Sequence, residues 1–419
     1  MSGVISNVTL SSGVRKATHL VGVRGGTWLA EVNERGRVQP RDGSPALDWY
    51  IAADDRWHDP SVESTVRQQR RAGVPVIETR LRVPSGDVVQ RVWAIAEGFV
   101  VAEFTNSSSM PVAVALSRGD VRCIRTPSPL GPQGIDLPAG SVVFPIAHGA
   151  ALTIALPMVR DAAINWGSLA TPDDMQKTWL AAVERSGYAL VPDKSLAPRI
   201  NTMRADLLAS SALPIDEWGS HVAGDDVSLA LSLLELVRMG ERIASWPQGE
   251  DVLERLAEAV TALLREHKKS DHVPWDVERA LFAAQWVFRA SGDLRAARDV
   301  ASSHVRLAAA SGPANQAPDG VRLGAWLDEQ LASPRRDGTI ALLGHGIPTL
   351  WRGVNFECHD IAIGEEASIS FAVRWHGDKP ALLWEVSRTS AVKLSAGMTD
   401  PDWSTTTTSG ETLLRGFVG

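Results

Sequence analysis

The sequence has 419 residues and a formal net charge of -7, and 44% of its residues are hydrophobic while 22% are charged. This length and composition predict a folded protein of two or three domains and exclude an intrinsically disordered chain. The acidic balance argues against nucleic acid as the main partner, because there is no long basic run. A neutral or weakly polar ligand fits the chain better.

Two features of the sequence bear on its compartment. The two cysteines, Cys123 and Cys358, are far apart and lack the spacing of a structural metal site. They indicate free thiols in a reducing environment. The chain does not start with an apolar signal segment, and nowhere do about eighteen apolar residues run together. We therefore expect a cytoplasmic protein without a membrane span, metal or organic cofactor.

Residues 1–160 have the pattern of an N-terminal β-sandwich, because short segments rich in Val, Ile and Thr alternate with turns and no helix intervenes. The clearest predicted strands are 26–32, 74–83, 88–96, 99–105, 112–116 and 151–156. Residues 41–60 crowd aromatic and acidic side chains together, including Asp48, Trp49 and Trp57. Either a polar loop packs over the sandwich here, or the loop reaches toward a ligand held by the next domain.

Residues 170–333 change to helical periodicity. The pattern predicts seven helices over 171–185, 195–213, 225–239, 250–268, 275–290, 294–310 and 321–331, which form an α-helical domain of hairpins. Strands return in residues 338–419, most clearly over 367–375 and 379–386. The predicted fold class is therefore a multidomain α+β protein, with an incomplete toroid of helical hairpins between two β regions.

The loop over residues 213–226 is the leading candidate site. It reads L-P-I-D-E-W-G-S-H-V-A-G-D-D and joins two predicted helices. Asp225 or Asp226 is a suitable N-cap, because a carboxylate accepts the unpaired N–H groups of a helix start. A cap does not require Glu217, Trp218 and His221 as well. Clustered carboxylates beside an indole are typical of sites that cleave glycosidic bonds.

A second loop is predicted to lie at the same end of the helical domain. Consecutive antiparallel helices bring the joints 213–226 and 268–275 to one mouth, because one complete hairpin separates them. The second joint adds Glu266, Asp276, His272 and Trp275 to the candidates. The alternative for Asp276 is a first-turn acid that stabilises its own helix, and for Glu266 it is an ordinary surface residue.

Residues 66–96 and the helical segment that carries Arg204 and Asp206 resemble the six-hairpin glycosidase superfamily of glucoamylases, glycogen-debranching enzymes and glucosidase-I-like enzymes. The resemblance implies a β-supersandwich before a toroid of helical hairpins, and hydrolysis with inversion at one mouth of the toroid. A complete toroid needs more helices than the sequence predicts, and an open cleft suits cleavage within a sugar chain. Within the group, the chain is similar to the endo-α-mannosidases that hydrolyse methylmannose polysaccharide.

The predicted function is therefore hydrolysis of an α-linked oligosaccharide or polysaccharide by two carboxyl groups. Glu217 or Glu266 is the candidate acid, and Asp226, Asp276 or Asp48 is the candidate base. The predicted substrate-binding residues are Trp49, Trp57, Trp218, His221, His272 and Trp275. The alternatives are an inactive glycan-binding protein on a hydrolase scaffold, an α-glucan debranching or phosphorylase enzyme, and a structural module in which the Trp residues are core and the acids are caps.

Overall fold

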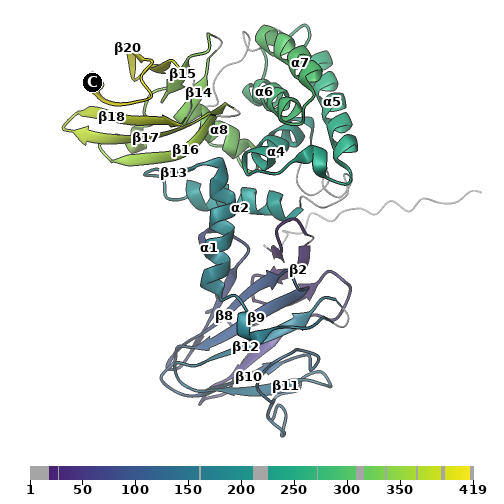
Figure 1. Ribbon diagram of the computed structural model, residues 1–419. Helices are drawn as coiled ribbons and strands as arrows, with labels where there is room; N and C mark the ends of the chain where they lie inside the picture. The colour runs from purple at the N-terminus through teal and green to yellow at the C-terminus, as the bar shows by residue number, and fades with distance from the viewer. Residues whose placement is uncertain are drawn as a thin grey trace, which may run out of the picture. The chain divides into compact units, whose positions relative to one another are not determined.

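The computed structural model describes residues 18–26, 28–159, 162–210, 225–270, 272–307, 316–335, 337–364, 367–387 and 392–415 (Figure 1). N-terminal antiparallel sheets are followed by a block that has seven α-helices among these residues, and then by C-terminal sheets. The predicted α+β fold class is confirmed. The chain forms two compact units, of which the first contains Trp28–Arg70 and Val76–Leu169 and the second contains Gly22–Thr27, Arg71–Pro75 and Ala170–Gly419.

The first unit consists of three sheets. They have the strand orders β1-β2-β3, β11-β10-β4-β5 and β12-β9-β8-β7-β6. The strands are β1 (Thr18–Gly22), β2 (Trp28–Asn33), β3 (Val38–Pro40), β4 (Trp49–Ala52), β5 (Trp57–His58), β6 (Arg67–Arg70), β7 (Ile77–Val83), β8 (Gly86–Ile95), β9 (Phe99–Asn106), β10 (Val112–Leu116), β11 (Val142–Ile146) and β12 (Ala151–Pro157).

The four-stranded and five-stranded sheets pack face to face, as the sequence predicted. Figure 1 shows the layer of β8, β9 and β12 lying over the layer of β10 and β11. Trp49 on β4 contacts Phe104 on β9, with 5.6 Å between ring centroids, so the core runs between the two sheets. The ladders are antiparallel, and β8 and β9 pair in register from Val88 opposite Asn106 to Ile95 opposite Phe99.

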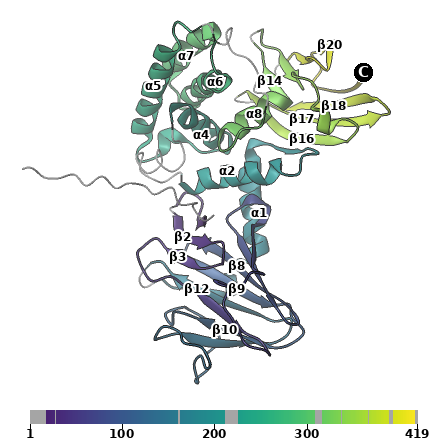
Figure 2. The same ribbon diagram turned by 180° about the vertical axis from the view of Figure 1, so that it is seen from behind.

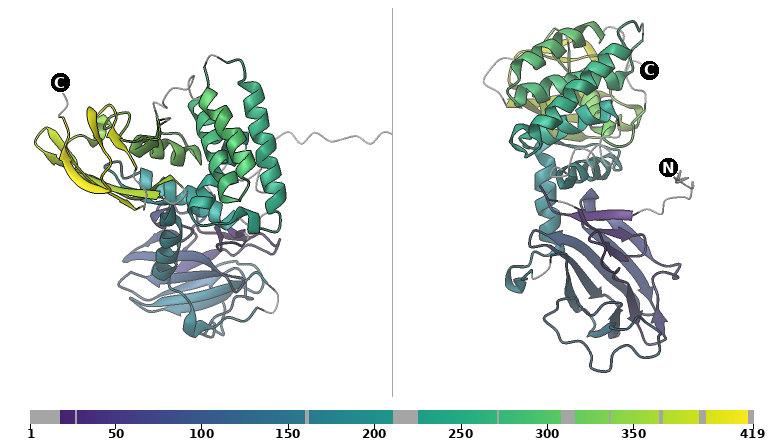
Figure 3. Two further views of the ribbon diagram at one scale, coloured as in Figure 1. Left: turned by 45° about the horizontal axis from the view of Figure 1, so that its top comes forward. Right: turned by 90° about the vertical axis from the view of Figure 1, so that its right-hand side faces the viewer.

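The helices of the second unit match the predicted ones closely. Figure 3 shows the green helices among them side by side. Thr171 caps the first helix and forms a reciprocal capping box with Asp174. Because these residue types at this spacing are typical of a helix start, the sequence predicted this start correctly. The helices are α1 (Pro172–Val183), α2 (Leu196–Ser210), α4 (Asp226–Arg238), α5 (Gly249–Glu266), α6 (Trp275–Ala290), α7 (Leu294–Leu307) and α8 (Arg322–Leu331).

The C-terminal strands of the second unit form two sheets, with the orders β13-β16-β17-β18-β21 and β14-β15-β19-β20. Figure 2 shows α8 between the helices α4 and α6 and the larger sheet. The strands are β13 (Tyr188–Leu190), β14 (Ala332–Pro334), β15 (Ile340–Leu342), β16 (Phe356–Gly364), β17 (Ala367–His376), β18 (Lys379–Ser387), β19 (Leu394–Ala396), β20 (Asp400–Thr405) and β21 (Ser409–Leu413).

Strand β13 connects the helical block to the C-terminal sheet. It lies between α1 and α2 in sequence, yet it pairs with β16, with Tyr188 opposite His359 and Leu190 opposite Glu357. The division into domains 1–160, 170–333 and 338–419 stays a prediction. Among the described residues, no helix is long and apolar enough to cross a bilayer.

Candidate functional site

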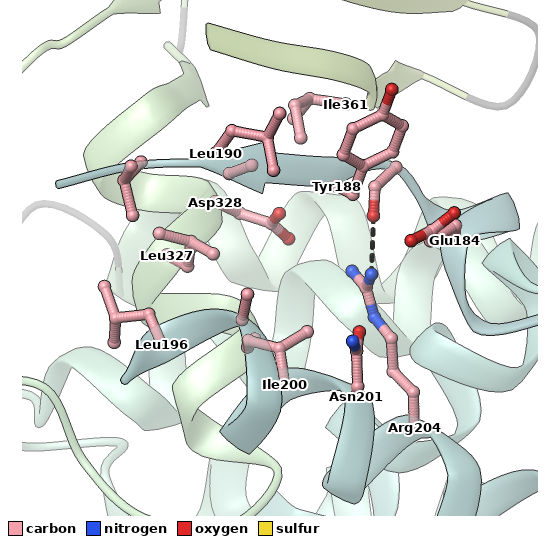
Figure 4. Close-up of a pocket in the computed structure, with 15 residues that line it drawn as sticks. Glu184, Tyr188, Leu190, Leu196, Ile200, Asn201, Arg204, Leu327, Asp328 and Ile361 are labelled. Carbon is pink, nitrogen blue, oxygen red and sulfur yellow. Dashed lines mark hydrogen bonds between the residues drawn. The ribbon is translucent and has the colours of Figure 1, made fainter. Parts of the chain in front are cut away.

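A small pocket with a cavity volume of about 60 Å³ lies in the second unit between α2, α8, β13 and β16 (Figure 4). Its polar lining residues include Glu184, Asn201, Arg204 and Asp328. Its apolar walls come from Leu190, Leu196, Ile200, Leu327 and Ile361. A concave, mostly apolar pocket with a few polar groups is the usual form of a small-molecule site.

A tight turn before β13 shapes one end of the pocket. Gly187 has φ 84°, and a Cβ atom there would lie 2.6 Å from the carbonyl oxygen of Asp360, so only glycine fits. Arg204 Nη1 donates to the Gly187 carbonyl oxygen at 2.5 Å and holds this turn against α2. Glu184 and Tyr188, on either side of the turn, therefore both line the pocket.

A buried ionic network supports the pocket. Arg204 Nε lies 2.8 Å from Glu235 Oε2, and both side chains are at most 5% exposed. Ser186 Oγ donates to the same carboxylate oxygen at 3.1 Å. Arg238 contacts Asp328 and also lies 3.5 Å from Glu235 Oε1. Two arginines and two carboxyl groups thus neutralise one another in a place where unpaired charges would be costly.

The environments of the two acids in this network push their pKa values apart. Burial raises the pKa of Asp328, and the neighbouring Glu235 carboxylate raises it further, against the charge of Arg238. Burial also opposes ionisation of Glu235, but Arg204 and Arg238 together lower its pKa. Asp328 therefore takes up a proton before Glu235 does, and it is the one of the two that faces the pocket.

A second carboxyl group lines the same pocket. Burial raises the pKa of Glu184, while the charge of Arg204 opposes the shift. In the view of Figure 4, the carboxyl groups of Glu184 and Asp328 lie on either side of the Arg204 guanidinium. Two carboxyl groups with raised pKa values in one pocket are typical of a site for general acid and base chemistry.

The predicted mouth is present in part, as a cluster around Arg322. Arg322 Nε lies 2.8 Å from Asp276 Oδ2, Nη2 lies 3.0 Å from Asp225 Oδ2, and Nη1 donates to Ser228 Oγ at 2.7 Å. The N-terminal ends of α4 and α6 therefore meet, as the alternation of helix directions predicted, and α8 begins at the same place. Asp225 rather than Asp226 is the N-cap of α4, because its side chain accepts from Ser228 N–H at 2.7 Å. Burial opposes its ionisation, but these hydrogen bonds lower the pKa of Asp225.

The other predicted residues of the mouth are placed less closely together. Asp226 Oδ1 lies 2.6 Å from Arg255 Nη2, and Trp275 is half-buried at the start of α6. Glu266 and His272 are exposed. Glu217, Trp218 and His221 lie outside the described residues.

The three candidates from the N-terminal loop lie in the first unit. Trp49 is 2% exposed in the sandwich core, where its indole donates to the Arg35 carbonyl oxygen at 3.1 Å. The expected stacking role for Trp49 is wrong, because packing in the core leaves no ring face for a sugar. Trp57 is half-buried, and its Nε1 donates to the Gln133 carbonyl oxygen at 2.7 Å. Burial raises the pKa of Asp48, against the charge of Arg37, whose Nη1 lies 3.4 Å from Asp48 Oδ2.

Sequence reasoning did not identify Glu184 and Asp328. Glu184 is the C-cap residue directly after α1, and Asp328 lies in α8, so the two are far apart in the chain and only the fold brings them to one pocket. One available signal was Asp328 in the segment L-D-E-Q, where an acidic pair follows the apolar run G-A-W-L of the predicted helix. Among the residues that the structure describes, no group of three or more His, Cys, Asp or Glu side chains could hold a metal ion.

Comparisons with known proteins add little to this geometry. No protein-family model matches the chain, and no curated protein matches it. Among solved structures, the chain is similar to the gh92 family glycosyl hydrolase ccman5, with a TM-score of 0.22 and 11% sequence identity over 78% of this chain and 56% of that one. The chain thus spans little more than half the length of that structure, and a likeness at this level carries no argument about activity.

Proposed function

We propose that the protein is a glycoside hydrolase that acts on an α-linked oligosaccharide or polysaccharide. The observation that carries the proposal is the pair of carboxyl groups, Glu184 and Asp328, whose pKa values are both raised in one pocket. Glycosidic cleavage requires one carboxylic acid to protonate the leaving oxygen and a second carboxyl group on the other face of the sugar.

The surroundings of the two groups suggest their roles. Asp328 is the general acid, because burial and then the neighbouring Glu235 carboxylate disfavour its ionisation, and Arg238 compensates only in part. Glu184 is the base that activates water, since the charge of Arg204 favours its ionised form. Arg204 lies beside both and stabilises a carboxylate at either position. Inversion of the anomeric configuration is part of the proposal.

The pocket walls favour a substrate with apolar substituents. The side chains of Leu196, Ile200 and Leu327 cannot form hydrogen bonds. The hydroxyl groups of an unmethylated glucan would therefore lose their hydrogen bonds to water here without gaining new ones. A methyl ether on the sugar replaces one hydroxyl donor with an apolar group. We therefore propose O-methylated α-mannosides as the first substrates to test, with endo-acting cleavage.

The experiment is a cleavage screen of the purified protein against α-linked manno- and gluco-oligosaccharides, with O-methylated mannosides included. We expect Asp328→Asn and Glu184→Gln to lower kcat/KM by about 10²–10⁴-fold, the usual contribution of a general acid or base. Asp226→Asn and Glu266→Gln are the matched controls, because each removes a carboxyl group that does not line the pocket. Thermal unfolding checks that each variant is folded.

Two outcomes would change the assignment. Loss of activity in Asp226→Asn, Asp276→Asn or Glu266→Gln, with full activity in the pocket variants, would move the reaction to the predicted mouth. Saturable sugar binding without cleavage would favour the second candidate, a glycan-binding protein on a hydrolase scaffold. The apolar walls of the pocket favour that candidate over a phosphorylase, because the one cationic side chain that lines the pocket, Arg204, is buried and paired with Glu235.

A further inference from the structure

A second hollow lies beside the pocket in the same unit. It has a cavity volume of about 480 Å³, and Leu196 lines both cavities. Helix α8 also serves both: Leu327 and Asp328 line the pocket, while Trp326 and Gln330 line the hollow. The two cavities are therefore neighbours, separated by one leucine side chain and one helix.

The lining of the hollow differs from that of the pocket. Asp193, Gln330, His345 and Arg352 give it charged and amide groups, and Trp326 gives it a half-buried indole. An indole face packs against the C–H face of a sugar ring, and the polar groups around it can pair with hydroxyls. This combination suits a sugar better than the largely aliphatic pocket does.

Two buried polar atoms on α8 strengthen this interpretation. Within the described chain, Trp326 Nε1 and Glu329 Oε2 are both buried and have no hydrogen-bond partner. Residues three apart lie on the same side of a helix, so an unpaired donor and an unpaired acceptor are neighbours here. The other carboxylate oxygen of Glu329 is 3.1 Å from Nε2 of His345, which lines the hollow. Of these two residues Trp326 lines the hollow, and a sugar hydroxyl there can accept from its indole N–H.

We propose that the hollow binds further units of the sugar chain whose cleaved bond lies in the pocket, with Trp326 as the stacking platform. The protein then recognises a chain that passes Leu196 and occupies both cavities, rather than a single sugar. This inference rests on the proposed function, because it assumes that the pocket holds a sugar.

The test is calorimetric binding of α-linked mannose and glucose disaccharides and pentasaccharides, with O-methylated mannosides included. Both proteins carry Glu184→Gln to prevent turnover. One has Trp326 as in wild type, and the other also carries Trp326→Ala. We expect Trp326→Ala to weaken pentasaccharide binding about tenfold, as for one lost aromatic contact, and to leave disaccharide binding within about twofold. Trp326→Phe keeps a ring face and should recover most of the pentasaccharide affinity. Trp246→Ala is the matched control, since Trp246 is also half-buried in this unit but lines neither cavity.

The outcomes separate the two proposals. Equal pentasaccharide affinity in wild type and Trp326→Ala would overturn the inference while leaving the proposed function in place. An equal loss for disaccharide and pentasaccharide would also overturn it, because a structural defect would then explain the change. Absence of binding to any sugar by either protein would overturn the proposed function and this inference together.

Discussion

The buried pair of Arg204 and Glu235 offers a prediction that can be worked out from the structure. Removing one member of a buried ion pair typically costs about 3–5 kcal/mol, because the other charge stays buried without its partner. Glu235→Gln keeps the shape of the side chain and leaves Arg204 Nε without the carboxylate that lies 2.8 Å away. Arg238 keeps Asp328 as a hydrogen-bond partner. We therefore expect a loss of about 3 kcal/mol, at the lower end of that range.

Urea unfolding followed by far-ultraviolet circular dichroism measures this loss, with Glu254→Gln on α5 as the control. Because Arg204 and Arg238 lower the pKa of Glu235 from its ordinary value of 4.5, the stabilisation by Glu235 is complete above pH 4.5. It is lost as the pH falls through the lowered folded-state pKa. The difference between Glu235→Gln and wild type should therefore shrink in acid. A difference below about 1 kcal/mol at neutral pH, the value of an exposed pair, would refute the reasoning.

Three further predictions concern two other ion-pair clusters of the second unit and the two thiols of the protein. Arg322→Ala should lower the free energy of unfolding in urea by about 1 kcal/mol, a small value because Asp225 is 54% exposed and solvent screens the pair; a loss as large as that of Glu235→Gln would contradict this. Burial opposes ionisation of Glu278, but its contacts with His304 and Arg279 lower its pKa to about 2. Glu278→Gln should therefore remove stability at neutral pH that wild type itself loses between pH 4.5 and about 2, and parallel Tm–pH profiles would exclude this role. Burial raises the pKa of the Cys358 thiol, so a thiol reagent should label it only after denaturation and should label the half-buried Cys123 first; equal rates in the folded protein would contradict the placement.

Local patterns were sufficient to predict the helices. The helix over 275–290 was predicted with its observed bounds, because its apolar residues recur at helical spacing and Pro274 precedes it. Asp225 was one of two candidate caps, and the Ser228 N–H donates to it. These features depend on residues within a few positions of one another, which a sequence shows directly.

The pocket could not be predicted in the same way. Strand β13 has three residues and is defined by its pairing with β16, about 170 positions further along the chain. Because β13, α2 and α8 converge only in the folded chain, the shared environment of Glu184 and Asp328 has no local signature. The helix directions predicted that the loops before α4 and α6 lie at the same end of the helices, and Asp225 and Asp276 do meet there at Arg322. The pairing of these carboxylates with an arginine could not be predicted, because Arg322 comes from α8.

The most direct test of hydrolysis by Glu184 and Asp328 follows the anomeric protons by proton nuclear magnetic resonance. Wild type, Glu184→Gln and Asp328→Asn are each given an α-linked O-methylated mannan oligosaccharide. If the protein hydrolyses an α-linkage with inversion, wild type first releases the β-anomer, which then mutarotates. We expect the folded variants to release sugar at least about a hundredfold more slowly. Release at undiminished rates by both variants would show that these carboxyl groups do not perform the reaction. No release by wild type from this or any other α-linked manno- or gluco-oligosaccharide would contradict the hydrolase itself.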